Sequence, residues 1–157
     1  MNITFELNGK IISAEVSPHQ PLRDILRSQF DLTGVKVGCH SGRCGVCSVL
    51  LDGKVIKSCL LMAPKANGRS ITTIEGLSIN GELHPVQQSF KDNFALQCGY
   101  CTPGFIMATV DYLSSSPSNP PVRDEIKTAI KGNVCRCTGY EKIISAVSNA
   151  ITSSESL

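Results

Sequence analysis

Apolar and polar residues alternate in short runs along the first half of the chain, and this period of two predicts half-buried β-strands. The runs cover residues 3–7, 11–16, 46–51, 54–60 and 70–74. Asn8-Gly9 separates the first two runs and favours a hairpin, because it supplies the positive φ angles of a type I′ turn. Asp52-Gly53 separates the third and fourth runs as a second turn. The first half therefore contains two predicted hairpins and one further strand.

One helical pattern lies between these hairpins. Leu22, Ile25 and Leu26 stand at helical spacing after Pro21, and a glycine-rich loop follows over residues 34–45. Two hairpins around a single helix predict a small α+β unit with a mixed sheet.

Beyond residue 76 the apolar period changes to about 3.6 residues, which predicts α-helices. Four are expected, over residues 84–96, 102–113 and 122–131 and from residue 141 onward. In the first of them, Phe94 and Leu96 are expected on the buried face together with Val86 and Phe90. Residues 114–121 are expected to be a loop, and residues 152–157 a frayed tail. The change of period predicts two domains, residues 1–78 and residues 79–157.

Threonines mark the predicted starts of two of these helices. Thr102 is expected to cap the second helix, with Pro103 at its first position. Thr138 and Glu141 have the spacing of a capping box, which predicts the start of the fourth helix. These signals place the beginnings of the two helices next to cysteine pairs.

Charge and composition exclude several classes of protein. The net charge is +2, with nine Lys and Arg against six Asp and Glu up to residue 78, and six against seven after it. Neither half has the basic stripe that nucleic-acid binding needs. The start lacks a secretory pattern, and no apolar run approaches the ~20 residues of a membrane-spanning helix. A cytoplasmic location is expected, and there the eight cysteines indicate metal ligation rather than disulfides.

The first cysteine set is Cys39, Cys44, Cys47 and Cys59. Its spacing, C-x4-C-x2-C followed by a distant fourth cysteine, is typical of plant-type [2Fe–2S] ferredoxins. The second hairpin is expected to bring the fourth cysteine back beside the loop that carries the other three. A structural zinc site fits this spacing poorly, because such sites use short cysteine pairs.

The second set consists of Cys98, Cys101, Cys135 and Cys137. Each pair falls between two predicted helices, so two interhelical turns at one end of a bundle could supply four thiolates. From the spacing alone, zinc remains an alternative to iron, because four thiolates in a tetrahedral array suit it too. A redox-active C-x-x-C pair is disfavoured, since no βαβ pattern surrounds it.

Three segments of the sequence carry a resemblance to a known family. Residues 38–47, 97–104 and 132–140 read GCHSGRCGVC, QCGYCTPG and GNVCRCTGY. They resemble the small iron–sulfur subunit of molybdenum hydroxylases, the family of xanthine dehydrogenase, carbon monoxide dehydrogenase and aldehyde oxidoreductase. The resemblance implies an N-terminal β-grasp, plant-type ferredoxin-like domain followed by an all-α four-helix bundle. It also implies a second [2Fe–2S] cluster on the second cysteine set.

The same resemblance implies partners and a role. Electrons would pass from a molybdenum–pterin centre in a large subunit, through the two clusters, to FAD in a medium subunit. The chain would thus be the iron–sulfur subunit of an oxidoreductase, with no complete active site of its own. Gln97 and Cys137 match the residues that contact the pterin in the family. The complex would be a heterotrimer, for which a dimer of heterotrimers is one further arrangement.

Other functions remain open at this point. A free-standing two-cluster ferredoxin that shuttles between partners is one, although a shuttle commonly carries strong acidic charge for steering and this chain is nearly neutral. A two-subunit enzyme that lacks FAD and passes electrons to another acceptor is a second. A structural zinc protein is a third, and it would be colourless. The substrate pocket lies outside this chain.

Overall fold

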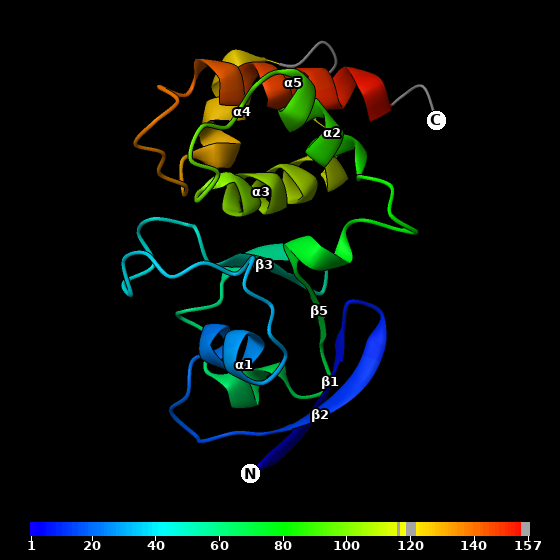
Figure 1. The fold of residues 1–157 in the computed structure, drawn as a ribbon, viewed down its shortest axis with the longest axis vertical. Helices are drawn as coiled ribbons and strands as arrows, with labels where there is room; N and C mark the ends of the chain where they lie inside the picture. The colour runs from blue at the N-terminus through cyan, green and yellow to red at the C-terminus, as the bar shows by residue number, and fades with distance from the viewer. Residues whose placement is uncertain (116, 119–121, 155–157) are drawn as a thin grey trace.

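The computed structural model describes residues 1–115, 117–118 and 122–154, and the protein forms two layers (Figure 1). One layer is a sheet with helix α1, and the other is a group of helices in which α3 lies against strand β3. The N-terminus and helix α5 (Glu141–Ser154) lie at opposite ends of the molecule. Half of the expected 114–121 loop and the last three residues of the expected tail lie outside the described residues.

The sheet has five strands in the order β2-β1-β5-β3-β4. The strands are β1 (Asn2–Leu7), β2 (Lys10–Glu15), β3 (Ser48–Leu51), β4 (Lys54–Lys57) and β5 (Ser70–Thr72). Strand β1 pairs antiparallel with β2 and parallel with β5, while β3 pairs antiparallel with both β4 and β5. The predicted α+β unit with a mixed sheet is therefore confirmed.

Both predicted hairpin turns are present. Asn8 and Gly9 have φ angles of 50° and 79°, and Asp52 and Gly53 have 49° and 78°. Positive φ at both central positions is the type I′ geometry, whose twist matches that of the flanking strands. Strands β3 and β4 are shorter than expected, because β4 ends at Lys57, which pairs with Ser48, the first residue of β3.

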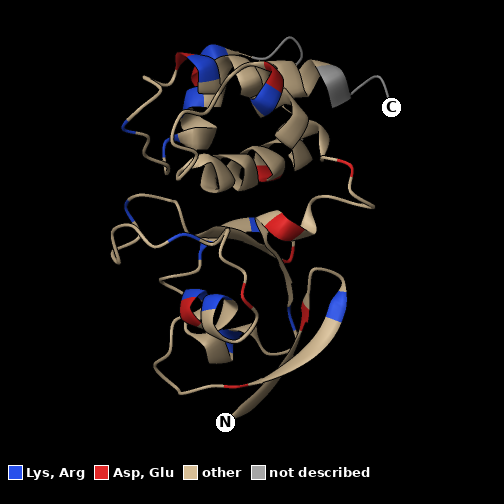
Figure 2. Cartoon of the chain, viewed as in Figure 1, with Lys and Arg blue, Asp and Glu red and all other residues tan. Residues whose placement is uncertain are grey.

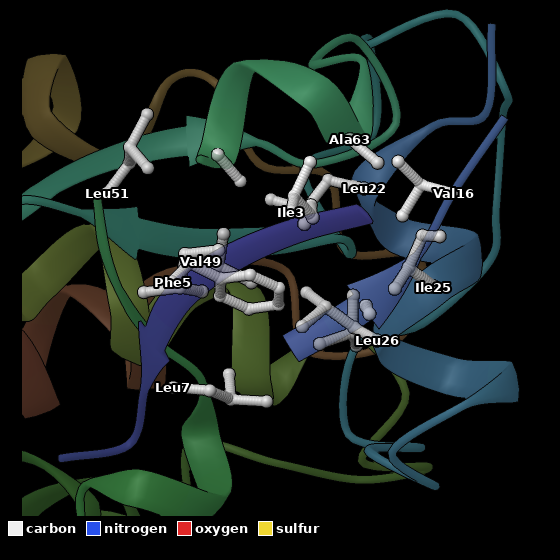
Figure 3. Packing of buried hydrophobic residues seen from close by; sticks show 14 of the residues in the cluster. Ile3, Phe5, Leu7, Val16, Leu22, Ile25, Leu26, Val49, Leu51 and Ala63 are labelled. Atoms are coloured by element: carbon white, nitrogen blue, oxygen red, sulfur yellow. The ribbon is translucent and has the colours of Figure 1, made fainter. Parts of the chain in front are cut away.

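Helix α1 (Leu22–Ser28) packs on one face of the sheet and closes the first hydrophobic core (Figure 3). Leu22, Ile25 and Leu26 are fully buried there, as their spacing predicts. Phe5 of β1 meets Phe30 edge to face, with ring centroids 6.0 Å apart. This core holds the sheet in place. Strands β3 and β4 of the sheet lie in the chain between Cys47 and Cys59 of the first cysteine set.

The second layer contains the four expected helices. They are α2 (Pro85–Asp92), α3 (Thr102–Ser114), α4 (Arg123–Ile130) and α5 (Glu141–Ser154). Their apolar faces form a second core around Phe90, Phe105 and Ile143. Leu50 of β3 and Leu77 also pack in this core, so it extends into the sheet layer. The exact boundary at residue 78 stays a prediction.

The expected extent of α2 is wrong. The helix ends at Asp92, and Phe94 takes a left-handed conformation with φ of 52°. Phe94 is 76% exposed and Leu96 is 44% exposed, so neither lies on the buried face of a helix. The apolar spacing could not show where the helix ends. Once the chain leaves the helix at Asp92, the side chains of Phe94 and Leu96 no longer point toward its buried face.

The predicted threonine caps are also wrong. Cys101 occupies the position before α3, and Thr102 is its first helical residue. Thr138 does not form the expected capping box with Glu141: its hydroxyl donates to Cys135 Sγ at 3.2 Å and accepts from the Tyr140 N–H at 3.4 Å, before the first residue of the helix. At the other end, α5 continues to Ser154, into the segment expected to be a frayed tail.

Both layers carry charges of both signs (Figure 2). An ion pair joins the layers, since Lys54 Nζ lies 3.0 Å from Asp111 Oδ1 and the Val55 N–H donates to Asp111 Oδ2 at 3.1 Å. Within the described residues, no helix combines the length and apolar character needed to cross a bilayer.

Candidate metal centres

The second hairpin brings the first cysteine set together. Cys47 immediately precedes β3, and Cys59 is the second residue after the end of β4. Ser58 ties the two segments, because its N–H and its hydroxyl both donate to the Cys47 carbonyl, at 3.3 and 2.6 Å. Cys47 and Cys59 are both buried, and they lie close enough for the Cys47 thiol to raise the pKa of Cys59. The expected return of the distant fourth cysteine is therefore present.

Loop amides surround the sulfur of Cys39. The N–H groups of Ser41, Arg43 and Cys44 approach Cys39 Sγ at 3.5, 3.2 and 3.3 Å. The loop can wrap around the sulfur because His40 takes a left-handed φ of 55°. Hydrogen bonds from the Ser41 and Cys44 amides lower the pKa of Cys39 to about 5. The loop therefore stabilises a thiolate, the form that binds metal.

The pKa of the buried thiol in this set, Cys59, shifts in the opposite direction. Burial raises the pKa of Cys59 to about 11, and the neighbouring Cys47 thiol adds to the rise. Two adjacent buried thiolates would repel each other without a cation between them. Metal binding at this position must therefore release a proton, which makes it dependent on pH.

The second cysteine set lies where two interhelical loops meet. Cys98 and Cys101 stand between α2 and α3, and Cys135 and Cys137 between α4 and α5. The Sγ atoms of Cys98 and Cys137 are 3.6 Å apart, and Cys135 lies close enough to Cys101 to raise the pKa of the Cys101 thiol. The first of these pairs is exposed, whereas Cys135 is buried. The structure thus brings together the four cysteines that the sequence grouped.

Cys135 has donors of its own. Its sulfur accepts from the N–H groups of Cys137 and Thr138, both at 3.4 Å, and from the Thr138 hydroxyl. Burial raises the pKa of Cys135, but these hydrogen bonds outweigh it and the net shift is downward. Burial raises the pKa of its neighbour Cys101 to about 12.

The donor chemistry fits two [2Fe–2S] clusters. The thiols lie in pairs: Cys98 with Cys137, Cys47 with Cys59, and Cys101 with Cys135. A [2Fe–2S] cluster takes four thiolates as two pairs, one pair on each iron. Thr102 Oγ1, next to Cys101, is buried without a hydrogen-bond partner among the described residues, so it is free to donate to a cluster sulfur.

Gln97 lies beside the exposed sulfur pair. It is exposed and immediately precedes Cys98, in the loop after α2. Because α2 ends at Asp92, Gln97 lies in the loop beyond the helix and not at the C-terminal end of the helix.

Two residues make contacts at the ligand loops that the sequence does not show. The Tyr140 hydroxyl accepts from the Cys135 N–H at 3.0 Å. Asn133 is buried and reaches across to the loop of the first set. Both lie in the 132–140 segment, but a motif shows which residues stand near ligands, not where their side chains point.

Comparison with known proteins extends this description. Residues 5–72 match the 2Fe-2S iron-sulfur cluster binding domain family, and residues 73–148 match the [2Fe-2S] binding domain family. The chain is 45% identical over 150 residues to the nicotine 6-hydroxylase small subunit of Paenarthrobacter nicotinovorans, covering 96% of this chain and 89% of that protein. It is also 45% identical to the xanthine dehydrogenase iron-sulfur-binding subunit of Escherichia coli O157:H7, covering 92% of each.

Solved structures agree with these relatives. Quinoline 2-oxidoreductase from Pseudomonas putida 86 has a chain that matches with a TM-score of 0.93 and 44% identity, over 98% of this chain and 94% of that one. Aldehyde oxidoreductase from Desulfovibrio gigas matches with a TM-score of 0.92 and 38% identity, over 99% of this chain but 17% of its own. Each half of the chain is thus a [2Fe–2S]-binding domain, and the chain belongs to the family of small iron–sulfur subunits of molybdenum hydroxylases.

Proposed function

We propose that this chain carries electrons through two [2Fe–2S] clusters between a large molybdopterin-binding subunit and a medium FAD-binding subunit. Cys39, Cys44, Cys47 and Cys59 would hold one cluster, and Cys98, Cys101, Cys135 and Cys137 the other. The observation that supports this most is that two complete sets of four thiols lie on loops that contact each other directly. When bound, the clusters supply one-electron redox chemistry, and the chain's residues hold them and exclude water.

The direction of electron transfer that we propose rests on which cysteines are exposed. Cys98 and Cys137 are exposed, and Gln97 stands next to them, so this edge is the side we assign to the large subunit and its pterin. The phenyl ring of Phe94 and the side chain of Leu96 are exposed on the same loop. Their burial against a partner would remove water from around this edge of the site.

A hetero-oligomer is supported by the relatives. Several are named as one subunit of a larger enzyme, such as caffeine dehydrogenase subunit gamma of Pseudomonas sp. and the 6-hydroxypseudooxynicotine dehydrogenase complex subunit beta. In the aldehyde oxidoreductase from Desulfovibrio gigas, the matching part is a segment of a longer chain. We therefore assign this chain to a heterotrimer in which the two partner subunits carry the molybdenum–pterin cofactor and FAD.

Purification from the native source tests this assignment. An affinity tag on this chain should retain one large subunit with molybdenum and one medium subunit with FAD, in equal amounts. Molybdenum without flavin would show a two-subunit enzyme that uses another acceptor. Elution of the chain alone near its own 16.8 kDa would contradict a fixed subunit and support a free shuttle.

Substitution of Gln97 tests the partner-facing edge. If the Gln97 amide hydrogen-bonds the pterin across a dry interface, its loss leaves a buried group unpaired, at about 1–3 kcal/mol. We expect Gln97→Ala to lower the molybdenum content of the complex or to slow reduction of the cluster held by Cys98, Cys101, Cys135 and Cys137, called the bundle cluster. Rapid-freeze EPR after mixing with substrate measures the rate of this reduction. Gln88→Ala is the matched control, because Gln88 donates to Asp92 on the exposed side of α2. Unchanged kinetics and molybdenum content in Gln97→Ala would leave Gln97 without a role.

A further inference from the structure

The loop of Cys44 and the loop of Cys135 meet at one polar contact. The Asn133 side-chain amide donates to the Gly45 carbonyl at 3.0 Å, and the Val134 N–H donates to the Cys44 carbonyl at 3.0 Å. Cys44 belongs to the first thiol set, and Val134 directly precedes Cys135 of the second. A single backbone hydrogen bond therefore connects a ligand of one set to the neighbour of a ligand of the other.

This contact is closely packed and buried. Asn133 is only 5% exposed. A Cβ atom on Gly45 would lie 2.4 Å from Asn133 Nδ2, and one on Gly104 would lie 2.3 Å from the Gly45 carbonyl oxygen. The Ser48 hydroxyl donates to the same carbonyl at 2.7 Å, so both of its lone pairs are used. Nothing larger than glycine fits between the loops, and the amide of Asn133 occupies the remaining space.

A second side chain supports the same loop. Lys57 Nζ donates to the Gly132 carbonyl at 2.8 Å, one residue before Asn133. The ion pair between Lys54 and Asp111 also joins the two layers, but it touches neither ligand loop. Within the described residues, the Tyr100 hydroxyl also donates to the Val37 carbonyl at 2.7 Å and joins the loop of Cys98 and Cys101 to the first ligand loop. The contacts at Asn133 and Gly132 are the ones that hold the loop of Cys135 against the first layer.

We infer that Asn133 is a positioning residue that holds the loop of Cys135 against the loop of Cys44 and so sets the separation and coupling of the two clusters. This inference rests on the proposed function. The connection runs from Cys44 through its carbonyl and the Val134 amide to Cys135. Asn133 keeps that hydrogen bond short, because its own amide is anchored on the adjacent Gly45 carbonyl.

Asn133→Asp tests the inference in the assembled complex. The substitution keeps the shape of the side chain but places an oxygen against the Gly45 carbonyl, which leaves buried acceptors facing each other. We expect the Val134 amide to exchange with solvent about 10- to 100-fold faster, as a buried polar group left unpaired costs on this scale. We also expect a weaker magnetic splitting between the two reduced clusters in low-temperature EPR, with the iron content unchanged.

Two further variants make the result decisive. Lys57→Met removes the second support without burying an unpaired acceptor in the contact, and we expect a smaller change of both readouts in the same direction. It decides the question if Asn133→Asp fails to fold. Lys54→Ala is the matched control, because it removes a contact between the layers outside the loops, and we expect both readouts to stay at wild-type values.

The outcomes separate this inference from the proposed function. Two cluster signals with unchanged splitting and unchanged Val134 exchange in Asn133→Asp and Lys57→Met would overturn the role of Asn133 alone. An equal loss of splitting in Lys54→Ala would also overturn it, since general docking of the layers would then explain the effect. The absence of a second cluster signal in the wild-type protein would instead overturn the proposed function.

Discussion

Gly45→Ala should abolish stable assembly of the first metal centre, although it adds a single methyl group. Gly45 has a φ of +74°, and a left-handed conformation costs a residue with a Cβ about 1–2 kcal/mol. The new Cβ would also lie 2.4 Å from Asn133 Nδ2 and 2.5 Å from the Gly132 carbonyl oxygen. Overpacking of this kind costs about 1–3 kcal/mol more, and here it forces the two ligand loops apart.

The expected result is measurable in the purified chain. Gly45→Ala should lose most of the iron of the ferredoxin-like domain and show a strongly lowered unfolding temperature. Gly53→Ala is the matched control, because Gly53 has a similar φ of +78° but no atom within 4 Å of the added Cβ. We expect about 1 kcal/mol of destabilisation and full iron content in the control. Equal losses in both variants would show that backbone strain alone, and not the contact between the loops, explains the effect.

Cys135→Ser should remove the bundle cluster and leave the other in place. Cys135 is buried and receives hydrogen bonds from the Thr138 amide and hydroxyl. Serine keeps the size of the side chain but is a poor ligand for iron, and small modules built around metal sites tend to lose order with the metal. We expect the iron content to fall from about four to about two per chain.

The structural consequence should be confined to the helical layer. Hydrogen exchange in Cys135→Ser should become faster over residues 79–157, while the EPR signal of the first cluster stays nearly intact. Cys59→Ser is the reciprocal control and should remove the first signal while the bundle signal remains. Loss of both signals in either variant would contradict two separable metal-binding domains.

The hairpins and the thiol groups could be predicted from the sequence because their determinants are local. Asn8-Gly9 and Asp52-Gly53 decide their turns by their own backbone preferences. The second hairpin then carries Cys59 back to Cys47 with no need for tertiary information. The apolar stripe of α5 likewise shows which of its faces is buried.

The end of α2 and the role of Thr138 could not be predicted in this way, although α3 and α5 begin at residues 102 and 141 as expected. Phe94 and Leu96 continue the apolar spacing of α2, yet the chain leaves the helix at Asp92 and exposes both. Thr138 has the spacing of a capping box, but its hydroxyl interacts with the sulfur of Cys135 instead of the helix. In both places the loop that carries the thiols overrides the local preference, which is expected at a functional site.

The contact between the loops was also beyond the sequence. Asn133 and Gly45 are 88 residues apart and belong to different layers. No periodicity or spacing relates them, because their contact depends on how α3 packs against β3. The motifs show the chemistry of each thiol set, whereas the relation between the two sets is a property of the folded chain.

Quantitative iron and EPR analysis of the purified full-length chain tests the central claim most directly. We expect about four irons and four acid-labile sulfides per chain, and two distinct [2Fe–2S] signals of equal intensity after reduction. A folded, colourless protein that contains zinc, or one with about two irons and a single signal, would contradict it.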